Sequence, residues 1–392
     1  MKIEIFPAKI GDCFLISYGN NYEKHILIDG GYKETYTKFL KKRLKEINKL
    51  NQKLELIIVT HIDQDHIGGI LSLVEENGTK LENNIIKIEE IWHNSYKHLQ
   101  DDIRKKVIIT PKELKVLEEI ISEGISLEAE SGDISSYQGS MLASYIYENN
   151  YKWNTQFEGK AISVDFSKKI TIDDELKIIL LSPSNKELEE LKREWEKELK
   201  KRILNFQLGE GKIFNDAFEF FLIRRDEEEE EGYTCSNNNG KWGELDFPKE
   251  DKSKTNGSSI AVILETKNKK VLFLGDSKPS IIIENLKKLV EENNYSLKFD
   301  AVKISHHGSL KNTNKELLEL IESENWIFTG DGNRNKPSEK LVKYILETKK
   351  DKIKKLIFNY DIDWLKSLKE IQKEYNCEIK INLKEESKIF IL

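Results

Sequence analysis

Four side chains that can bind metal ions lie within six residues of one another, directly after an apolar run. They are His61, Asp63, Asp65 and His66, and the run before them is 54–60. A short apolar run is typical of a strand buried on both faces, and ligands of α/β sheets bind where strands end. Imidazole and carboxylate groups together suit divalent ions such as zinc, manganese or iron. The alternative is a helix N-terminus capped by Asp63 or Asp65, but four candidate ligands in six positions favour a metal site.

Two later segments end in polar residues in the same way. Asp276 directly follows an apolar strand pattern, where a carboxylate is costly unless it is paired or ligating, so it could bridge two ions; a simple turn Asp is the alternative. His306 and His307 follow another such pattern, and one could ligate a metal while the other donates a hydrogen bond or a proton. Asp29 ends an earlier strand pattern, and we expect it to support the metal loop from behind.

In this order, the motifs resemble the metallo-β-lactamase superfamily of binuclear metallohydrolases. The resemblance is strongest to the branch that contains the hydrolase domain of the competence-channel protein ComEC and the pneumococcal phosphorylcholine esterase. It covers 1–92 and 250–340 but not 185–255. The motifs that carry it are Gly11-Asp12, Asp29-Gly30-Gly31, Thr60–Gly69, Asn256–Ser259, Gly275-Asp276 and His306–Ser309.

The resemblance implies two divalent metal ions, zinc or manganese, and a role for each matching residue. The implied ligands are His61 and Asp63 for the first ion, Asp65 and His66 for the second, Asp276 as the bridge, and His307 from the last motif. Asp65 would also orient the nucleophile, and His306 would line the pocket as the candidate general acid, although the residues alone do not distinguish the two adjacent histidines. The residues implied to support the ligands or contact the substrate are Asp12, Asp29, Asn256 and Ser309.

The chain departs from the superfamily at the histidine that normally completes the first metal site. Between the second motif and Asp276 the sequence contains only His93 and His98. His93 follows a predicted strand, so metal ligand, substrate contact and ordinary strand-end residue are all open for it, whereas we expect His98 at the surface. Asp63 replaces the middle histidine of the family motif, and this harder ligand makes manganese plausible beside zinc.

The expected chemistry is metal-assisted hydrolysis, because a divalent ion lowers the pKa of bound water from about 16 to about 7 and stabilises charge on the scissile group. Our first hypothesis is a phosphodiesterase, and more narrowly a nuclease. Its groove could be lined by Lys303, Lys311, Arg334 and Lys336, although Lys336 also replaces a substrate-side histidine of the branch. The alternatives are a hydrolase of a small phosphodiester or other ester, and a partner subunit of a multiprotein assembly with a regulatory metal site.

From the resemblance of the motifs and the strand pattern we expect an αββα sandwich of the α/β (α+β) class to position these residues, with two mixed β-sheets face to face, helices outside and the metals at one edge. We expect strands up to about residue 183 in the first sheet and those from 258 on in the second. The predicted strands are 2–6, 13–19, 25–31, 54–60, 85–92, 161–166, 176–183, 258–266, 269–276, 299–305, 353–360 and two at the C-terminus. The predicted helices are 34–49, one after 69, one from Thr110, and those at 138–149, 185–206, 314–322, 338–348 and 363–374.

Composition sets the outer limits. The 392 residues carry a net charge of −6, and the acidic run 226–231 accounts for that excess, so acidity does not exclude a polyanionic substrate. No run approaches the roughly 18 apolar residues of a membrane span, and three isolated cysteines fit a reducing compartment, so we expect a cytoplasmic protein without a membrane partner. We predict one domain over 1–392, with a helical elaboration at 94–160. A charged, partly flexible insertion at 185–255 could contact a protein partner.

Overall fold

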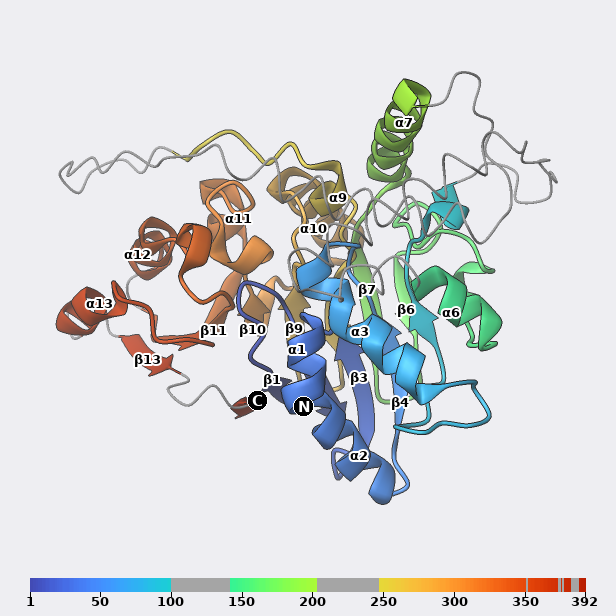
Figure 1. Cartoon of the computed structure of the whole chain (residues 1–392). Coiled ribbons are helices and arrows are strands. Elements are labelled where there is room, and N and C mark those ends of the chain that lie inside the picture. Colours follow the sequence, from blue (N-terminus) through green and yellow to red (C-terminus); the bar gives the residue numbers. More distant parts are fainter. Residues whose placement is uncertain (100–141, 203–246, 350–351, 373–374, 376, 382–387) are drawn as a thin grey trace.

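The computed structural model describes residues 1–99, 142–202, 247–349, 352–372, 375, 377–381 and 388–392. These residues form two facing β-sheets with helices on both outer sides (Figure 1). The predicted αββα sandwich of two mixed sheets is therefore confirmed. Within the described ranges, no helix combines the length and the apolar character needed to cross a bilayer.

The first sheet has six strands in the order β14-β1-β2-β3-β4-β5. They are β1 (Lys2–Ile5), β2 (Phe14–Tyr18), β3 (Lys24–Ile28), β4 (Lys53–Ile58), β5 (Ile91–Trp92) and β14 (Lys388–Ile391). The pairs from β14 to β3 are antiparallel, whereas β3, β4 and β5 run parallel. Because parallel strands end at the same edge of a sheet, the loops after β3 and β4 bring Asp29 and His61 together.

The second sheet has eight strands in the order β13-β12-β11-β10-β9-β8-β7-β6. They are β6 (Lys169–Thr171), β7 (Lys177–Ser182), β8 (Ala261–Glu265), β9 (Lys270–Phe273), β10 (Lys298–Lys303), β11 (Glu322–Phe328), β12 (Lys354–Phe358) and β13 (Cys377–Ile381). Strands β6 to β9 pair antiparallel, and β9 to β13 are parallel. The parallel half directs the residues after β9 and β10, Asp276 and His306, to one edge.

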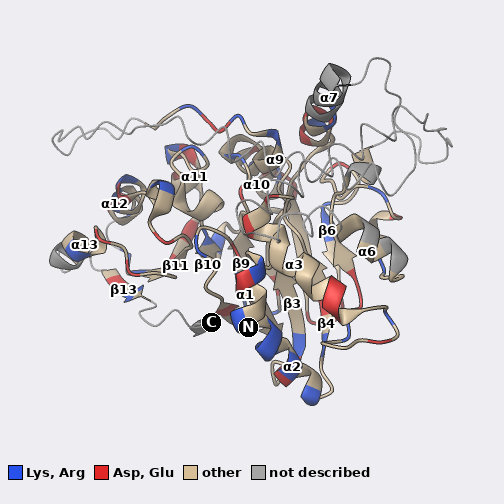
Figure 2. Cartoon of the chain, viewed as in Figure 1, with Lys and Arg blue, Asp and Glu red and all other residues tan. Residues whose placement is uncertain are grey.

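Helices cover the outer face of each sheet (Figure 1). On the first sheet they are α1 (Lys33–Thr35), the π-helical η1 (Tyr36–Leu40), α2 (Lys41–Lys49), α3 (Gln64–Asn77) and α6 (Leu142–Glu148). On the second sheet they are α10 (Pro279–Asn293), α11 (Lys315–Leu320), α12 (Glu339–Glu347) and α13 (Leu365–Ile371). The remaining helices are η2 (Tyr96–Leu99), η3 (Thr155–Phe157), α7 (Asn185–Arg202), α9 (Lys254–Gly257), η5 (Ser305–Gly308) and η6 (Asn333–Asn335). Figure 2 shows acidic and basic residues spread over these outer helices and loops, while the strands are mostly uncharged.

Apolar side chains alternate between two sides of each inner strand, so each sheet packs on both faces. In β8, Val262 and Leu264 lie between the sheets, whereas Ala261 and Ile263 lie under the outer helices. The inter-sheet layer includes an edge-to-face contact between Phe14 and Phe273, whose ring centroids are 5.4 Å apart. Such aromatic pairs contribute about 0.5–1.5 kcal/mol beyond burial of their area. This layer holds the two halves of the metal edge in fixed register.

The predicted division of strands between the sheets is wrong for three strands, two in the middle of the chain and one at its C-terminal end. Strands β6 and β7 lie in the second sheet, because β7 pairs antiparallel with β8 from Lys177 to Ser182. The last strand, β14, returns to the first sheet and pairs with β1. Partner choice depends on contacts far apart in the sequence, and the alternation of apolar residues does not encode it.

Several predicted elements also differ in extent or identity. The segment 161–166 forms turns instead of a strand, because the Ser163 hydroxyl accepts from the amide of Asp165 and the Ser163 carbonyl from the amide of Phe166. Of 85–92, only Ile91–Trp92 forms a strand. Helix α10 and strand β11 were not predicted. The predicted helix over 34–49 is confirmed as a continuous helical segment with a π-helical turn.

Parts of the two predicted additions fall beyond the described residues. The helix expected from Thr110 and the acidic run 226–231 both lie outside them. The boundaries at 94–160 and 185–255 therefore stay predictions, and so does a protein partner there. The expected helix at 185–206 is described as far as Arg202.

Candidate metal centre

The loop after β4 carries the first group of candidate ligands into the start of α3. Asp63 occupies the residue before α3, but its side chain makes no capping hydrogen bond to the helix. Its carboxylate Oδ2 instead lies 3.2 Å from Nε2 of His61. The helix-cap alternative therefore does not describe Asp63, whose carboxylate faces the imidazole.

Asp29 supports this loop from behind, as the sequence predicts. Its Oδ1 accepts a hydrogen bond from the amide of Thr60 at 2.7 Å, and its Oδ2 accepts one from the Thr60 hydroxyl at 2.7 Å. The same Oδ2 lies 2.8 Å from Nδ1 of His66. A carboxylate can only accept, so Nδ1 of His66 carries a hydrogen, and the neutral ring would present the lone pair of Nε2 toward the centre.

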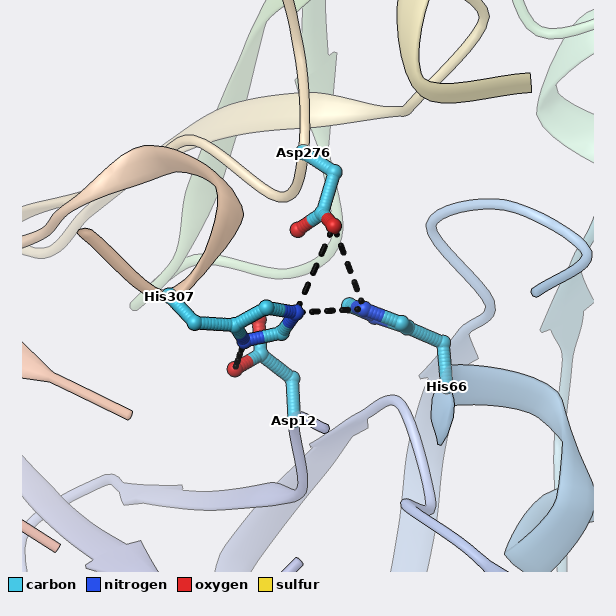
Figure 3. A group of neighbouring side chains, drawn as sticks. All are labelled: Asp12, His66, Asp276 and His307. Carbon is cyan, nitrogen blue, oxygen red and sulfur yellow. Dashed lines mark hydrogen bonds and ion pairs between the residues drawn. The ribbon is translucent and has the colours of Figure 1, made fainter. Parts of the chain in front are cut away.

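Two imidazole nitrogens and two carboxylates converge at one buried point. Nε2 of His66 and Nε2 of His307 are 3.4 Å apart, and Oδ2 of Asp276 lies 3.5 and 3.4 Å from them (Figure 3). Oδ2 of Asp65 lies 3.8 Å from the first nitrogen and 3.5 Å from the second. Four electron-rich atoms at these distances repel one another unless a cation or protons lie between them.

His307 is anchored from behind in the same way as His66. Its Nδ1 lies 3.2 Å from Oδ1 of Asp12 and 2.9 Å from the hydroxyl of Thr329. Asp12 in turn contacts the ammonium group of Lys303, which is only 1% exposed and also donates to the carbonyl of Gly275 at 3.1 Å. Buried charges persist when they are paired and hydrogen-bonded, and this lysine satisfies that condition.

The turn that carries the histidine pair is strained. His306 and His307 both have positive φ values, 48° and 56°, in the left-handed region. For residues other than glycine this costs on the order of 1–3 kcal/mol each, and such strain is concentrated at functional sites. Hydrogen bonds to both rings offset this strain. The His307 ring bonds to Asp12 and Thr329, and the His306 ring bonds to Asn312.

A second, less complete group of ligands surrounds His61. Its Nδ1 lies 3.0 Å from the Thr60 hydroxyl, and its Nε2 lies 3.8 Å from Oδ2 of Asp276. This buried Nε2 has no hydrogen-bond partner among the residues that the structure describes. Buried polar atoms are normally satisfied, so an orphaned nitrogen beside two carboxylates fits a metal ligand.

Charge sets the protonation of the metal-free cluster. Burial and the neighbouring His66 lower the pKa of His61 to about 4. Burial alone would also lower the pKa of His307, but the carboxylates of Asp276 and Asp12 raise it to about 10, and those of Asp276 and Asp65 raise the pKa of His66 well above its usual value. Protons thus balance the carboxylates in the metal-free protein, and a divalent ion could replace them.

His306 lies at the edge of the cluster, with its Nε2 3.6 Å from Oδ2 of Asp276. Its Nδ1 is 2.8 Å from Oδ1 of Asn312, whose amide nitrogen donates to Oδ2 of Asp251 and to the carbonyl of Asp276, both at 3.0 Å. Because that amide oxygen can only accept, Nδ1 of His306 is the donor. The ammonium group of Lys336 contacts the remaining nitrogen, Nε2.

The remaining predicted residues, Asn256, Ser309 and His93, contact residues outside the four converging side chains. Asn256 donates to Oδ2 of Asp251 at 2.7 Å, so it supports the His306 edge. The hydroxyl of Ser309 accepts from the amide of Lys311 in the following turn, so its described bond does not involve a cluster residue. The His93 ring stacks against Trp153 with the centroids 6.1 Å apart.

Two expectations about neighbouring residues are wrong. His98 is buried, not at the surface, because it packs edge-to-face on Trp153 at 4.5 Å. Lys303 does not line an open groove, because its ammonium group is enclosed beside Asp12 and Asp276. The sequence did contain a sign of this, because Lys303 is a charged residue at the end of the apolar strand β10. Thr329 and Asp251 gave no such signal.

Comparison with known proteins agrees with this architecture. Residues 7–130 match the family model of the metallo-beta-lactamase superfamily. Together with the two-sheet sandwich, this match over the N-terminal third of the chain identifies the fold as that of the metallo-β-lactamases. A search of curated proteins found no match.

Several solved structures are similar over the whole chain. Igni18, described as a novel metallo hydrolase from Ignicoccus hospitalis, is 9% identical with a TM-score of 0.39, covering 100% of both chains. Tm1679, described as a metal-dependent hydrolase of the beta-lactamase superfamily, is 11% identical with a TM-score of 0.38, covering 100% of this chain and 99% of that one. Zn²⁺-bound PqqB from Methylobacterium extorquens is 8% identical with a TM-score of 0.37, covering 100% of both. Similarity at this level carries no argument about activity.

Proposed function

We propose that the protein is a metal-dependent hydrolase of phosphodiesters, with nucleic acid as its substrate. The observation that carries the proposal is the convergence of Nε2 of His66 and His307 with the carboxylates of Asp65 and Asp276 at one buried point. Imidazole and carboxylate donors are the ligands that zinc and manganese share. The buried and otherwise unsatisfied Nε2 of His61 supports a second ion beside the first.

The proposed ligands divide into two sets that share one carboxylate. Asp65, His66 and His307 would hold one ion, His61 and Asp63 would hold the other, and Asp276 would contribute to both. A divalent ion in such a site supplies water of lowered pKa and stabilises negative charge on the scissile group. The second set has fewer protein ligands within reach, so we propose that its ion exchanges more readily.

The residues behind the ligands orient them. Asp29 fixes the tautomer of His66, and Asp12 with Thr329 holds the ring of His307, which are the carboxylate–histidine arrangements that keep Nε2 directed at a metal. The Asp65 side chain is 16% exposed, so it lies at the open side of the cluster. We propose that it orients the attacking water as well as ligating.

His306 is the proposed residue for proton transfer to the leaving group. Burial and the neighbouring Lys336 lower its pKa to about 4, so at neutral pH it is uncharged. Its Nε2 then accepts the hydrogen bond from the Lys336 ammonium group. We therefore propose that the proton for the leaving group comes from the Lys336 ammonium group by way of His306, because the uncharged His306 ring carries no additional proton to donate.

Support for the phosphodiester comes from two sources. The motifs resemble those of the branch that contains the ComEC hydrolase domain, and two-metal sites are well suited to in-line displacement at phosphorus. The test is cleavage of labelled DNA, labelled RNA and bis-(p-nitrophenyl) phosphate by the protein with Mn²⁺ or Zn²⁺. Cleavage should fall at least about 100-fold in Asp276→Asn and Asp65→Asn proteins.

The control for this test is Asp173→Asn, which removes a carboxylate paired with Lys24 at the opposite end of β3. Circular dichroism should show that all three variants remain folded. Cleavage at the wild-type rate by the Asp276→Asn and Asp65→Asn proteins would rule out the proposed site. Cleavage of bis-(p-nitrophenyl) phosphate without any cleavage of nucleic acid would replace the nuclease by a hydrolase of small phosphodiesters.

A further inference from the structure

The two oxygens of the Asp276 carboxylate have different surroundings. Oδ2 faces the histidines, with Nε2 of His66 and His307 at 3.5 and 3.4 Å and Nε2 of His61 at 3.8 Å (Figure 3). Oδ1 is buried, and no hydrogen bond reaches it from the residues that the structure describes. The ammonium group of Lys303 lies 3.8 Å from Oδ1. One oxygen therefore faces both proposed ligand sets, and the other faces a lysine.

Lys303 is fixed relative to the turn that carries Asp276. Its ammonium group contacts the Asp12 carboxylate and donates to the carbonyl of Gly275, the residue before Asp276, at 3.1 Å. An ammonium group has three N–H donors. With two of them directed at Asp12 and Gly275, the third can be directed at Oδ1 of Asp276. The separation of 3.8 Å is too long for a hydrogen bond but short enough for attraction between the charges.

The backbone of Asp276 is fixed on both sides, so the side-chain torsions are its remaining freedom. The amide donates to the Ser259 hydroxyl at 3.0 Å, and the carbonyl accepts from the Asn312 side chain at 3.0 Å. The terminal torsion of an aspartate is broad, so the residue alone does not decide how the plane of its carboxylate is turned. Attraction to Lys303 keeps Oδ1 on the lysine side and leaves Oδ2 for the histidines.

We propose that Lys303 is a positioning residue that turns the Asp276 carboxylate so that a single oxygen, Oδ2, is shared by the two metal ions. This inference rests on the proposed function, because it needs both proposed ligand sets. Without Lys303 the carboxylate turns, and Oδ2 no longer faces both sets. The loss falls on the ion beside His61 and Asp63, because the other ion keeps Asp65 and two histidines.

A charge-matched variant separates this role from the effect of charge. Lys303→Met alone removes a cation, and a more negative site attracts divalent ions more strongly. Lys303→Met combined with Asp12→Asn removes one charge of each sign, so the net charge of the cluster is unchanged. Asp12→Asn alone keeps the lysine. The matched control is Lys354→Met, because Lys354 is also buried, at 3% exposure, but donates to two backbone carbonyls at the start of β12, away from the metal edge.

The test measures the affinity for each of two Mn²⁺ ions by calorimetric titration of the metal-free protein. In the double variant we expect the affinity for the weaker ion to fall about 10- to 100-fold relative to the wild type, the usual loss around a metal site. The tighter ion should lose less. The ratio of the two affinities should stay as in the wild type in Lys354→Met, and Asp12→Asn should not weaken the second ion selectively. Circular dichroism and urea unfolding show that each variant is folded.

A crystal structure of the loaded proteins tests the position of the carboxylate itself. In the wild type we expect one oxygen of Asp276 to ligate both ions. In the double variant we expect Asp276 to ligate a single ion, or to use a different oxygen for each ion. The same shared oxygen in the double variant, or affinities that fall equally for both ions, would overturn the inference and leave Lys303 as a structural partner of Asp12.

The two proposals can fail separately. A wild type that binds two ions but cleaves no phosphodiester would contradict the proposed function, and the titration would still decide the role of Lys303. A wild type that binds fewer than two ions would overturn the role of Lys303 whatever its activity. A wild type that binds two ions through separate oxygens of Asp276 would overturn it as well, without contradicting the proposed hydrolysis.

Discussion

Oδ2 of Asp29 lies 2.8 Å from Nδ1 of His66, and the same oxygen accepts a hydrogen bond from the hydroxyl of Thr60. One carboxylate therefore fixes both the loop after β4 and the tautomer of the imidazole that begins α3. Asp29 itself has a positive φ of 54°, which places its side chain across the end of the parallel strands. The relationship links the geometry of the sheet edge to the direction of a metal-binding nitrogen.

Replacing this carboxylate should weaken metal binding while the ligands stay in place. Asp29→Asn keeps the shape but removes the charge that favours the Nδ1–H tautomer of His66. We expect the affinity for Zn²⁺ to fall about 10- to 100-fold, as for other partners of metal-bound histidines. Competition with a fluorescent chelator measures it, with Asp173→Asn as the control. Affinity equal to that of the wild type would show that Asp29 has only a structural role.

Breaking the buried pair of Lys303 and Asp12 should lower the free energy of unfolding of the metal-free protein. Lys303→Met removes the lysine from the buried Asp12 carboxylate and leaves only the protonated His307 beside it, and breaking such a buried pair typically costs about 3–5 kcal/mol. Urea unfolding in the presence of a chelator measures the loss. Adding Asp12→Asn to Lys303→Met should recover part of it, because the uncompensated charge is gone. A loss below about 1 kcal/mol in Lys303→Met would contradict the pairing.

Two adjacent glycines near the start of α3 should differ in how much stability they lose on replacement by alanine. A Cβ on Gly69 would lie 2.0 Å from the carbonyl oxygen of Gly30, so Gly69→Ala forces the loop after β3 away from α3. We expect a loss of about 1–3 kcal/mol or more in the free energy of unfolding, together with weaker metal binding. A Cβ on Gly68 meets nothing closer than 3.3 Å, so Gly68→Ala should change stability by less than about 1 kcal/mol. Equal unfolding midpoints for the two variants would refute the close contact.

Metal binding should strengthen as the pH rises. In the metal-free protein the pKa of His307 is raised to about 10 by Asp276 and Asp12 despite its burial, so at neutral pH its imidazole is protonated. A metal ion needs a neutral Nε2, so binding must release that proton, and a higher pH favours the release. Between about pH 6 and pH 8 the apparent affinity should rise about 10-fold per pH unit for each proton displaced. Calorimetry in buffers of different ionisation enthalpy counts the protons, and a pH-independent affinity would contradict this protonation.

The candidate ligands could be predicted because each interrupts or ends an apolar strand pattern. His61, Asp63, Asp276 and the His306–His307 pair all follow buried strands, where polar residues need a specific reason. The fold was predicted from the resemblance that these motifs carry, together with the strand pattern. The partners of β7 and β14 could not be predicted, because pairing depends on which distant strand presents a free edge.

The supporting residues were harder to predict than the ligands. Asp251 matters through its contact with His306, and Thr329 through its contact with His307. In each case the two partners are distant in the sequence, so no local pattern connects them. Lys303 was visible as a charge in an apolar strand, but its partner Asp12 is almost 300 residues away. Local patterns identify candidate ligands, whereas the hydrogen bonds that orient them require the folded chain.

The central claim is that His66, His307, Asp65 and Asp276 hold a metal ion. It is tested most directly by a crystal structure of protein grown with Zn²⁺ or Mn²⁺, with anomalous data collected above the absorption edge of the metal. The account predicts an anomalous peak about 2.0–2.2 Å from Nε2 of both histidines and from an oxygen of both carboxylates. A metal-loaded crystal with no peak among these four side chains, or with the metal bound elsewhere on the chain, would contradict it.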